Sequence, residues 1–194
     1  ASGTEVTFKY VFGTLKRLAV QTEAWAATEN YESNIEEYMG DDVSYHMRRL
    51  LNKPIEILGT TRQYIKGNWK FYAENTKDPY HASLLHLFHA TFGLYRSSQQ
   101  GESIVNNKVH CLIWVKSSEE KKSALDDVKK ENLRTMQQGN YALADESLLA
   151  GQQEFEDGHS LDILSMFPSL VLQQIQNTLA FRQILPKGKD EFEL

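Results

Sequence analysis

Cysteine is nearly absent from this 194-residue chain, in which Cys111 is the only one. A single cysteine excludes an internal disulfide framework and is typical of proteins from reducing compartments. Long apolar runs are missing too: no stretch approaches the eighteen residues of a membrane-spanning helix, and the first residues lack a signal-peptide pattern. These absences predict a cytoplasmic protein that does not enter a membrane.

An excess of basic residues is also missing. Lys and Arg number 21 against 26 Asp and Glu, which gives a net charge of −5. Domains that bind nucleic acids usually carry a basic patch, so this balance argues against a nucleic-acid partner. Hydrophobic content of 41% and charged content of 24% are ordinary for a globular protein, and the length suits one domain with a sizeable core.

The residues that can carry chemistry concentrate in the stretch Asn68–His89, which reads NWKFYAENTKDPYHASLLHLFH. Four residues separate His81 from His86, and Asp78 lies three positions before the first histidine. Neutral imidazole is a good ligand for iron, zinc, copper and nickel. Residues five apart point about 140° away from each other on an ideal helix. Both rings can therefore reach one metal only if the helix ends or distorts nearby, or if it lies against the site at an angle; otherwise they are packed, hydrogen-bonded side chains.

The residues around this pair resemble the mononuclear-iron motif of the Rieske non-haem iron aromatic ring-hydroxylating oxygenases, in their large (alpha) subunit. The matching positions keep the order and spacing of the family: Asn68-Trp69-Lys70, Glu74-Asn75, Asp78, Tyr80-His81 and His86. Other stretches resemble the branch that oxidises aromatic carboxylates, with terephthalate dioxygenase and salicylate hydroxylase: Lys53–Ile57, His81–His86, Glu154–Gly158 and Val171–Asn177. The resemblance is nearly continuous from about residue 35 to residue 194.

The resemblance implies a helix-grip, Bet v1-like catalytic domain in which His81 and His86 hold a mononuclear Fe(II). Asp78 would link this iron to a Rieske [2Fe-2S] cluster in a neighbouring subunit. A reductase, directly or through a ferredoxin, would supply electrons. O2 would then hydroxylate an aromatic carboxylate, as a cis-diol or as a single hydroxyl, in the breakdown of aromatic compounds. The family also implies a homo-oligomer, a trimer of alpha subunits with or without beta subunits.

A substrate pocket for such a compound should have apolar walls and a few polar contacts. Leu85 and Phe92 are expected in the walls and Asn75 as a polar contact, although the apolar residues equally suit an ordinary core. Arg182 lies among apolar residues of a predicted strand. It either points to water from an edge strand or faces inward, where a guanidinium requires an anion. The resemblance to the carboxylate branch favours the substrate carboxylate as that anion.

Two parts of such a subunit are not found in the sequence. A Rieske cluster needs two cysteines and two histidines, whereas this chain has one cysteine. The family's third iron ligand, an acid, follows the strand that begins at Asp190, and Asp157 and Asp162 lie in the wrong segment for that role. We therefore assign no third ligand, and expect a portion of the subunit that is inactive alone. The alternatives are a module that only binds an aromatic acid and an inert fragment.

The domain assignment follows from where the resemblance is strong. Residues 34–194 are expected to hold the N-terminal and central parts of the catalytic domain. Residues 1–33 match weakly and are assigned to the end of the cluster domain and its linker. His46 and His159 have no partner in the sequence and are predicted as surface or cap residues. His89 is predicted to pack rather than to bind metal, and His110 to be structural.

The hydrophobic pattern predicts an α+β fold, an antiparallel sheet with helices on one face. Asp41 or Asp42 is expected to cap the second helix. Helices are predicted at 34–40, 41–51, 69–75, 79–88 and 118–138, and residues 145–155 are predicted to form a short helix or an ordered loop. Strands are predicted at 5–12, 54–65, 101–115 (a hairpin that turns at Asn106–Asn107), 161–167, 169–177, 178–185 and 191–194.

Overall fold

The computed structural model describes residues 35–86, 89, 95, 99–117 and 154–194. The predicted strand at 5–12, the predicted helix at 118–138 and nearly all of the segment at 145–155 lie outside these residues. Within them the predicted α+β class is confirmed. No helix in the described part of the chain is long and apolar enough to cross a membrane.

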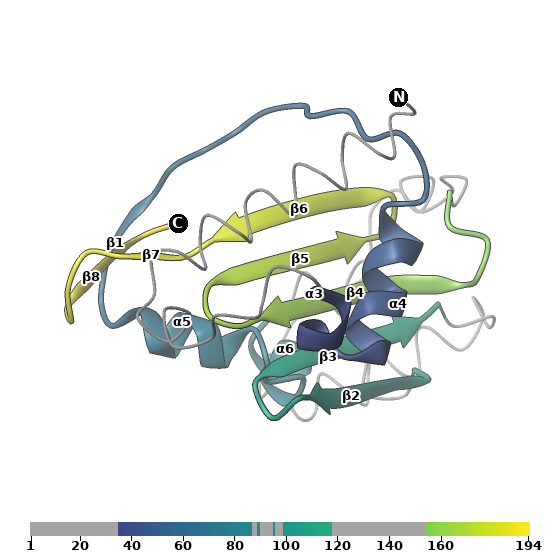
Figure 1. Ribbon diagram of the computed structural model, residues 1–194, viewed down its shortest axis with the longest axis horizontal. Coiled ribbons are helices and arrows are strands. Elements are labelled where there is room, and N and C mark those ends of the chain that lie inside the picture. Colours follow the sequence, from purple (N-terminus) through teal and green to yellow (C-terminus); the bar gives the residue numbers. More distant parts are fainter. Residues whose placement is uncertain (1–34, 87–88, 90–94, 96–98, 118–153) are drawn as a thin grey trace, which may run out of the picture.

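A five-stranded antiparallel sheet in the order β2-β3-β4-β5-β6 forms the centre of the molecule (Figure 1). Strands that follow one another in sequence also pair in space. Short turns join β2 to β3, β4 to β5 and β5 to β6, whereas residues 117–158 separate β3 from β4. The predicted hairpin is confirmed, and its turn places Asn107 and Lys108 at positive φ values of 49° and 65°. The strands are β2 Gly101–Asn106, β3 His110–Lys116, β4 His159–Met166, β5 Leu170–Ile175 and β6 Thr178–Gln183.

A smaller sheet in the order β1-β8-β7 lies at one end of the molecule. Its strands are β1 Tyr64–Lys66, β7 Leu185–Pro186 and β8 Glu191–Glu193. The prediction of a strand at 54–65 is therefore wrong except at its last residues. β8 is only three residues long and pairs with Tyr64–Lys66, and next to it Gln63 exchanges two backbone hydrogen bonds with Leu194 (2.9 Å each). Residues 54–62 have no strand partner among the described residues. That segment is largely exposed, and Leu58 is 89% exposed.

Two helices, α3 Ile35–Met39 and α4 Asp41–Leu50, cover one face of the large sheet (Figure 1). Apolar residues on one side of α4, three or four positions apart, pack against every second residue of the central strands. These spacings follow from the 3.6-residue period of a helix and the two-residue period of a strand. This core contains Val43, Met47, Leu50, Leu112, Leu164 and Leu172. The predicted cap by Asp41 or Asp42 is wrong: Gly40, at φ 81°, is the N-cap, and the carboxylate of Asp42 accepts a hydrogen bond from Asn106 instead (3.0 Å).

The other two described helices, α5 Trp69–Asn75 and α6 Tyr80–Leu85, lead to the opposite face of the sheet. Thr76, directly after α5, joins its hydroxyl to that of Ser165 on β4 (3.0 Å). Ser165 points away from α4, because its neighbour Leu164 packs beneath that helix. Helices therefore contact both faces, and α6 lies behind the sheet in Figure 1.

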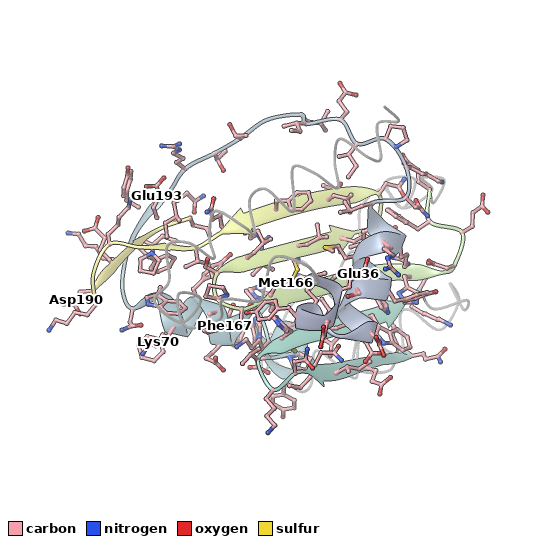
Figure 2. All side chains as sticks on the ribbon, viewed as in Figure 1. Glu36, Lys70, Met166, Phe167, Asp190 and Glu193 are labelled. Carbon is pink, nitrogen blue, oxygen red and sulfur yellow. The ribbon has the colours of Figure 1, made fainter. Side chains whose placement is uncertain are left out.

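Lys70 on α5 and Asp190 beside β8 lie toward the end with the small sheet, whereas Glu36 on α3 lies over the large sheet (Figure 2). The motif residues Asn75, Asp78, His81 and His86 lie on or beside α5 and α6, which connect β1 of the small sheet to β2 of the large sheet.

Candidate functional site

The two histidines of the motif turn their rings toward one point. The Nε2 atoms of His81 and His86 are 3.2 Å apart. Two imidazole nitrogens that bind one metal at about 2.1 Å are about 3.0 Å apart at a right angle and about 3.4 Å apart at the tetrahedral angle. The observed separation lies between these values, so two ligands of one ion can have it; it is also the distance of an N–H···N hydrogen bond between the two rings.

The end of α6 produces this convergence. The helix stops at Leu85, and His86 leaves it with φ −105° and ψ 84°. The predicted helix to residue 88 is thus too long, while the requirement that the helix end near the pair is met. Because the chain turns at His86, its ring is not directed about 140° away from His81, as an unbroken helix would demand.

Asp78 fixes the orientation of His81. Its Oδ1 accepts the backbone N–H of Tyr80 (2.8 Å) and, more weakly, that of His81 (3.4 Å), which satisfies free donors at the start of α6. Its backbone carbonyl lies 2.7 Å from Nδ1 of His81. A carbonyl oxygen can only accept, so Nδ1 carries the proton and Nε2 keeps its lone pair for the shared point. The Asn75 amide lies 3.2 Å from the same Nε2.

His89 places a third imidazole next to His86. The ring centroids of His86 and His89 are 5.2 Å apart, and those of His81 and His86 are 5.0 Å apart. Burial, followed by the nearby charges of His86 and His81, lowers the pKa of His89 to about 4. His89 is therefore neutral at physiological pH, a state that both a packed and a metal-binding imidazole can have, so its predicted packing role stays a prediction.

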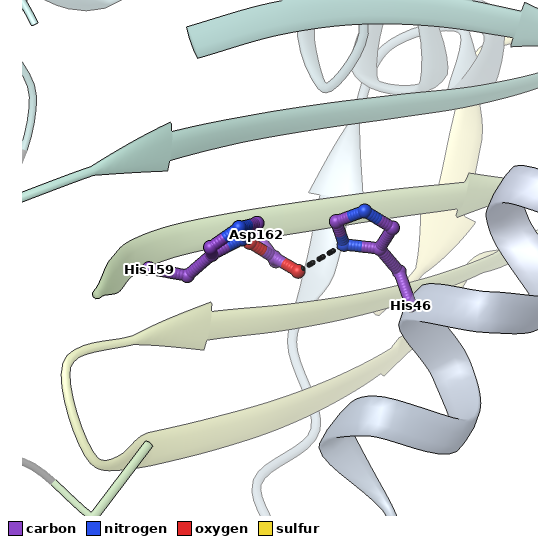
Figure 3. Close-up of side chains that lie close together, drawn as sticks. All are labelled: His46, His159 and Asp162. Carbon is purple, nitrogen blue, oxygen red and sulfur yellow. Dashed lines mark hydrogen bonds and ion pairs between the residues drawn. The ribbon is translucent and has the colours of Figure 1, made fainter. Parts of the chain in front are cut away.

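A second cluster lies on the other face of the sheet, beneath α4. His46, His159 and Asp162 could each offer one ligand atom, and these atoms lie within 4.8 Å of one another (Figure 3). Nδ1 of His46 is 2.6 Å from one carboxylate oxygen of Asp162, and Nδ1 of His159 is 2.9 Å from the other. The prediction that His46 and His159 are surface or cap residues is wrong, because His46 is buried and His159 is half-buried against Trp114.

Arg49 makes this second cluster unsuitable for a metal ion. Its guanidinium donates to Asp162 (3.2 Å), to Oε1 of Gln174 (2.6 Å) and through two nitrogens to Asp157. A fixed cation that shares the Asp162 oxygen with His46 opposes the binding of a metal cation. The nitrogen atoms of His46, His159 and Arg49 are already paired with the oxygen atoms of Asp162, so the cluster fits a metal poorly. It forms a buried hydrogen-bonded network that joins α4 to the sheet.

The charges in this network shift two pKa values. Hydrogen bonds from Arg49 lower the pKa of Asp157 to about 2. Burial by itself would raise the pKa of Asp162, but hydrogen bonds from His159 and His46 and the charge of Arg49 outweigh it, so this pKa is also lowered. Both carboxyl groups are therefore ionised at neutral pH.

The expected substrate residues lie in different surroundings. Asn75 is exposed beside His81, and Leu85 is 71% exposed. Phe92 lies outside the described residues. Arg182 is half-buried on β6 opposite Val171, so it shares the sheet face that Ser165 and Thr76 occupy. Its side chain forms no ion pair or hydrogen bond within the described part of the chain.

A cavity of about 280 Å³ lies between α5 and the turn that joins β4 to β5. Asn75, Leu85 and Arg182 are not in its wall, so it is a different space from the expected substrate pocket. Its lining is mainly apolar, with Lys70, Glu74 and Lys77 as the charged residues: Trp69, Lys70, Ala73, Glu74, Thr76, Lys77, Ser165–Val171 and Ile184.

Sequence reasoning did not find the buried network, although a signal for it existed. The apolar residues of α4 repeat at helical spacing through Val43, Met47 and Leu50, which places His46 and Arg49 at the edge of the same stripe. Two polar residues on a core-facing stripe need buried partners. Their partner Asp162 could have been suspected in a strand that is otherwise largely buried and apolar.

Taken together, the fold and the convergent imidazoles define an α+β domain with a candidate two-histidine metal centre. A sequence profile for the ring hydroxylating alpha subunit (catalytic domain) matches residues 24–194. The chain therefore belongs to the ring-hydroxylating oxygenase alpha subunits, through their catalytic domain, and the resemblance seen in the motif is confirmed. This family is iron-dependent.

Individual relatives agree with this assignment. The chain is 47% identical over 160 residues to the large subunit of anthranilate 1,2-dioxygenase from Burkholderia cepacia, covering 81% of this chain and 37% of that protein. It is 47% identical over 161 residues to the terephthalate 1,2-dioxygenase terminal oxygenase component subunit alpha 2 from Comamonas sp, covering 83% and 38%. It is 29% identical over 201 residues to the salicylate 5-hydroxylase large oxygenase component from Ralstonia sp, covering 98% and 46%. The chain spans less than half the length of these curated relatives.

Proposed function

We propose that this chain is the iron-binding part of an oxygenase that hydroxylates an aromatic carboxylate, with His81 and His86 as two ligands of a mononuclear Fe(II). The observation that carries the proposal is the 3.2 Å separation of the two Nε2 atoms within the family motif. The proton on Nδ1 of His81, fixed by the Asp78 carbonyl, supports it, since hydrogen bonds of this kind orient metal-binding imidazoles.

The protein groups have separate tasks in this proposal. When bound, Fe(II) would supply the activation of O2 with electrons delivered from a Rieske [2Fe-2S] cluster. Asp78 holds the start of α6 and, through its carbonyl, the ring of His81. Its carboxylate is half exposed, with 48% of the side chain accessible, and is therefore open to a neighbouring subunit, as the family resemblance implies. The partners would be a reductase or ferredoxin and further copies of the subunit.

Arg182 is the proposed contact for the substrate carboxylate. It is half-buried on the sheet face toward which α5 and Thr76 lead, and it has no partner within the described residues. A guanidinium pairs well with a carboxylate because its N–H groups match the two oxygens. The relatives are named for anthranilate, terephthalate and salicylate, which are all aromatic carboxylates.

The metal assignment is tested by Fe(II) binding under anaerobic conditions in competition with a chelator. His81→Ala and His86→Ala should each lower the affinity at least tenfold, since each removes one of two imidazoles. The matched control is His159→Gln, which removes a donor from the second cluster and should leave the affinity unchanged. Loss of iron in the His159 variant but not in the other two would move the metal beneath α4 and refute the assignment.

The substrate assignment is tested in the intact oxygenase with benzoate and with a ring of similar size that lacks the carboxylate. Arg182→Leu should lower kcat/KM for benzoate. The expected loss of transition-state stabilisation is about 1.5–3 kcal/mol, the range for a hydrogen bond to a charged group. The uncharged ring should be affected much less. Equal losses on both substrates would show that Arg182 supports the fold instead of binding the carboxylate.

A further inference from the structure

The sheet face opposite α4 is a mainly apolar floor with a few polar residues. Antiparallel pairing places Ser165, Val171 and Arg182 in one row across the strands. Adjacent strands are about 4.8 Å apart, so Arg182 is about 10 Å from Ser165, where Thr76 anchors the segment that leads to His81. Arg182 and the histidine motif therefore belong to the same side of the molecule.

Gln173 is the unexplained polar residue on this floor. It is 6% exposed, and it pairs with Ile163 on one side and Ala180 on the other. Its amide forms no hydrogen bond with any residue in the described part of the chain. The amide is not among the polar atoms that are both fully buried and unpaired, so it keeps access to the space beside this face and can take a partner from outside the chain.

The neighbouring Gln174 shows what a structural glutamine looks like in this protein. It is fully buried on the opposite face. Its Oε1 accepts from Arg49 (2.6 Å), and its Nε2 donates to the carbonyls of His159 (3.1 Å) and Gln176 (2.9 Å). The two glutamines share residue type, strand and burial, so the absence of partners is particular to Gln173.

Gln173 and Arg182 are diagonal neighbours. Gln173 is directly opposite Ala180, and Arg182 lies two residues further along β6 on the same face. Such diagonal positions are about 7–8 Å apart, within reach of long side chains. A guanidinium and an amide at this separation can hold two polar groups of one small ring compound.

Building on the proposed function, we infer that Gln173 recognises a hydroxyl or amino group on the ring of the aromatic acid whose carboxylate Arg182 binds. An amide offers two N–H donors and a carbonyl acceptor, so it can pair with either substituent. A site with a buried amide disfavours a ring that lacks the matching group, because the amide then stays without a partner. Gln173 is thus a specificity residue, and Arg182 provides the shared carboxylate contact.

The test compares equilibrium binding of benzoate, salicylate and anthranilate to the intact oxygenase by calorimetry. Gln173→Leu should weaken binding of salicylate or anthranilate about tenfold, the effect of roughly one hydrogen bond, and change benzoate binding less than about twofold. Thermal melting provides a second measurement. Gln173→Leu should melt near the wild-type temperature, whereas the matched variant Gln174→Leu should melt lower and keep the wild-type preference among the three acids.

Each outcome bears on a separate claim. A uniform loss for all three acids in Gln173→Leu, or a melting temperature lowered as far as in Gln174→Leu, would show that Gln173 is structural and overturn the inference. If Arg182→Leu still lowers binding of all three acids in that case, the proposed function stands without it. Failure of the wild-type oxygenase to bind any of the acids would overturn both.

Discussion

Arg49 allows a sharp test of the buried network, because α4 carries a matched arginine beside it. We expect Arg49→Met to lower the free energy of unfolding by about 3–5 kcal/mol, the range for removing one partner of a buried ion pair. Methionine keeps an unbranched apolar stem, so the packing of the side chain changes little.

The structure shows where that free energy comes from. Asp162 has no exposed surface, so among the described residues its charge would keep only the contacts with His46 and His159 once Arg49 is removed. Gln174 also loses the donor to its buried Oε1, which costs about 1–3 kcal/mol for an unsatisfied polar atom. The contact with Asp157 contributes less, since 42% of that side chain is exposed and water can replace the guanidinium.

Arg48 is the control. It pairs with Glu36, but the two side chains are 56% and 41% exposed, so Arg48→Met should change stability by less than about 1 kcal/mol. Both variants are compared by urea unfolding, where a shift of the midpoint at constant slope reports stability. The Arg49→Met, Asp162→Asn double variant should lose less than the sum of the single losses. If Arg49→Met is as stable as Arg48→Met, the network does not hold α4 to the sheet.

Three further predictions follow from the same contacts. The pKa values of Asp157 and Asp162 are lowered in the folded state, so their stabilisation is full above the unfolded pKa of about 4 and is lost as the pH falls below it, toward about 2 for Asp157; unfolding at a series of pH values should show this loss, and it should be smaller in Arg49→Met. Asn107→Ala should lower the free energy of unfolding by about 1–2 kcal/mol, measured by thermal or urea unfolding, because it removes hydrogen bonds to two α3 carbonyls and places alanine at φ 49°. Asn107→Gly should regain only the share that comes from the strained φ, since glycine also lacks the hydrogen bonds. Asp78→Asn keeps the Oδ1 acceptor at the start of α6 and should leave Fe(II) affinity near the wild-type value, whereas Asp78→Ala should lower it; equal affinities would show that this cap does not orient His81.

Much of the fold could be predicted because it depends on neighbours in the sequence. The strands after residue 159 alternate or run apolar between clear breaks, and the structure places them within two residues of the prediction. The helix at Trp69–Asn75 begins with Asn68, whose side chain accepts from Lys70, a local signal. The strand predicted at 54–65 was wrong since a strand requires a partner, and β8 pairs only with its last residues.

The sequence by itself determined the motif, and with it the family, because a run of residues in fixed order is a property of the chain alone. It also determined that an ideal helix through both His81 and His86 points the two rings about 140° apart, so the helix must end, distort or lie at an angle to the site before both can reach one metal. Only the tertiary structure decided that the rings converge, since this depends on the backbone turn at His86. Only the tertiary structure revealed the network of His46, Arg49 and Asp162, because Asp162 is more than a hundred residues from the other two and meets them where α4 packs on β4.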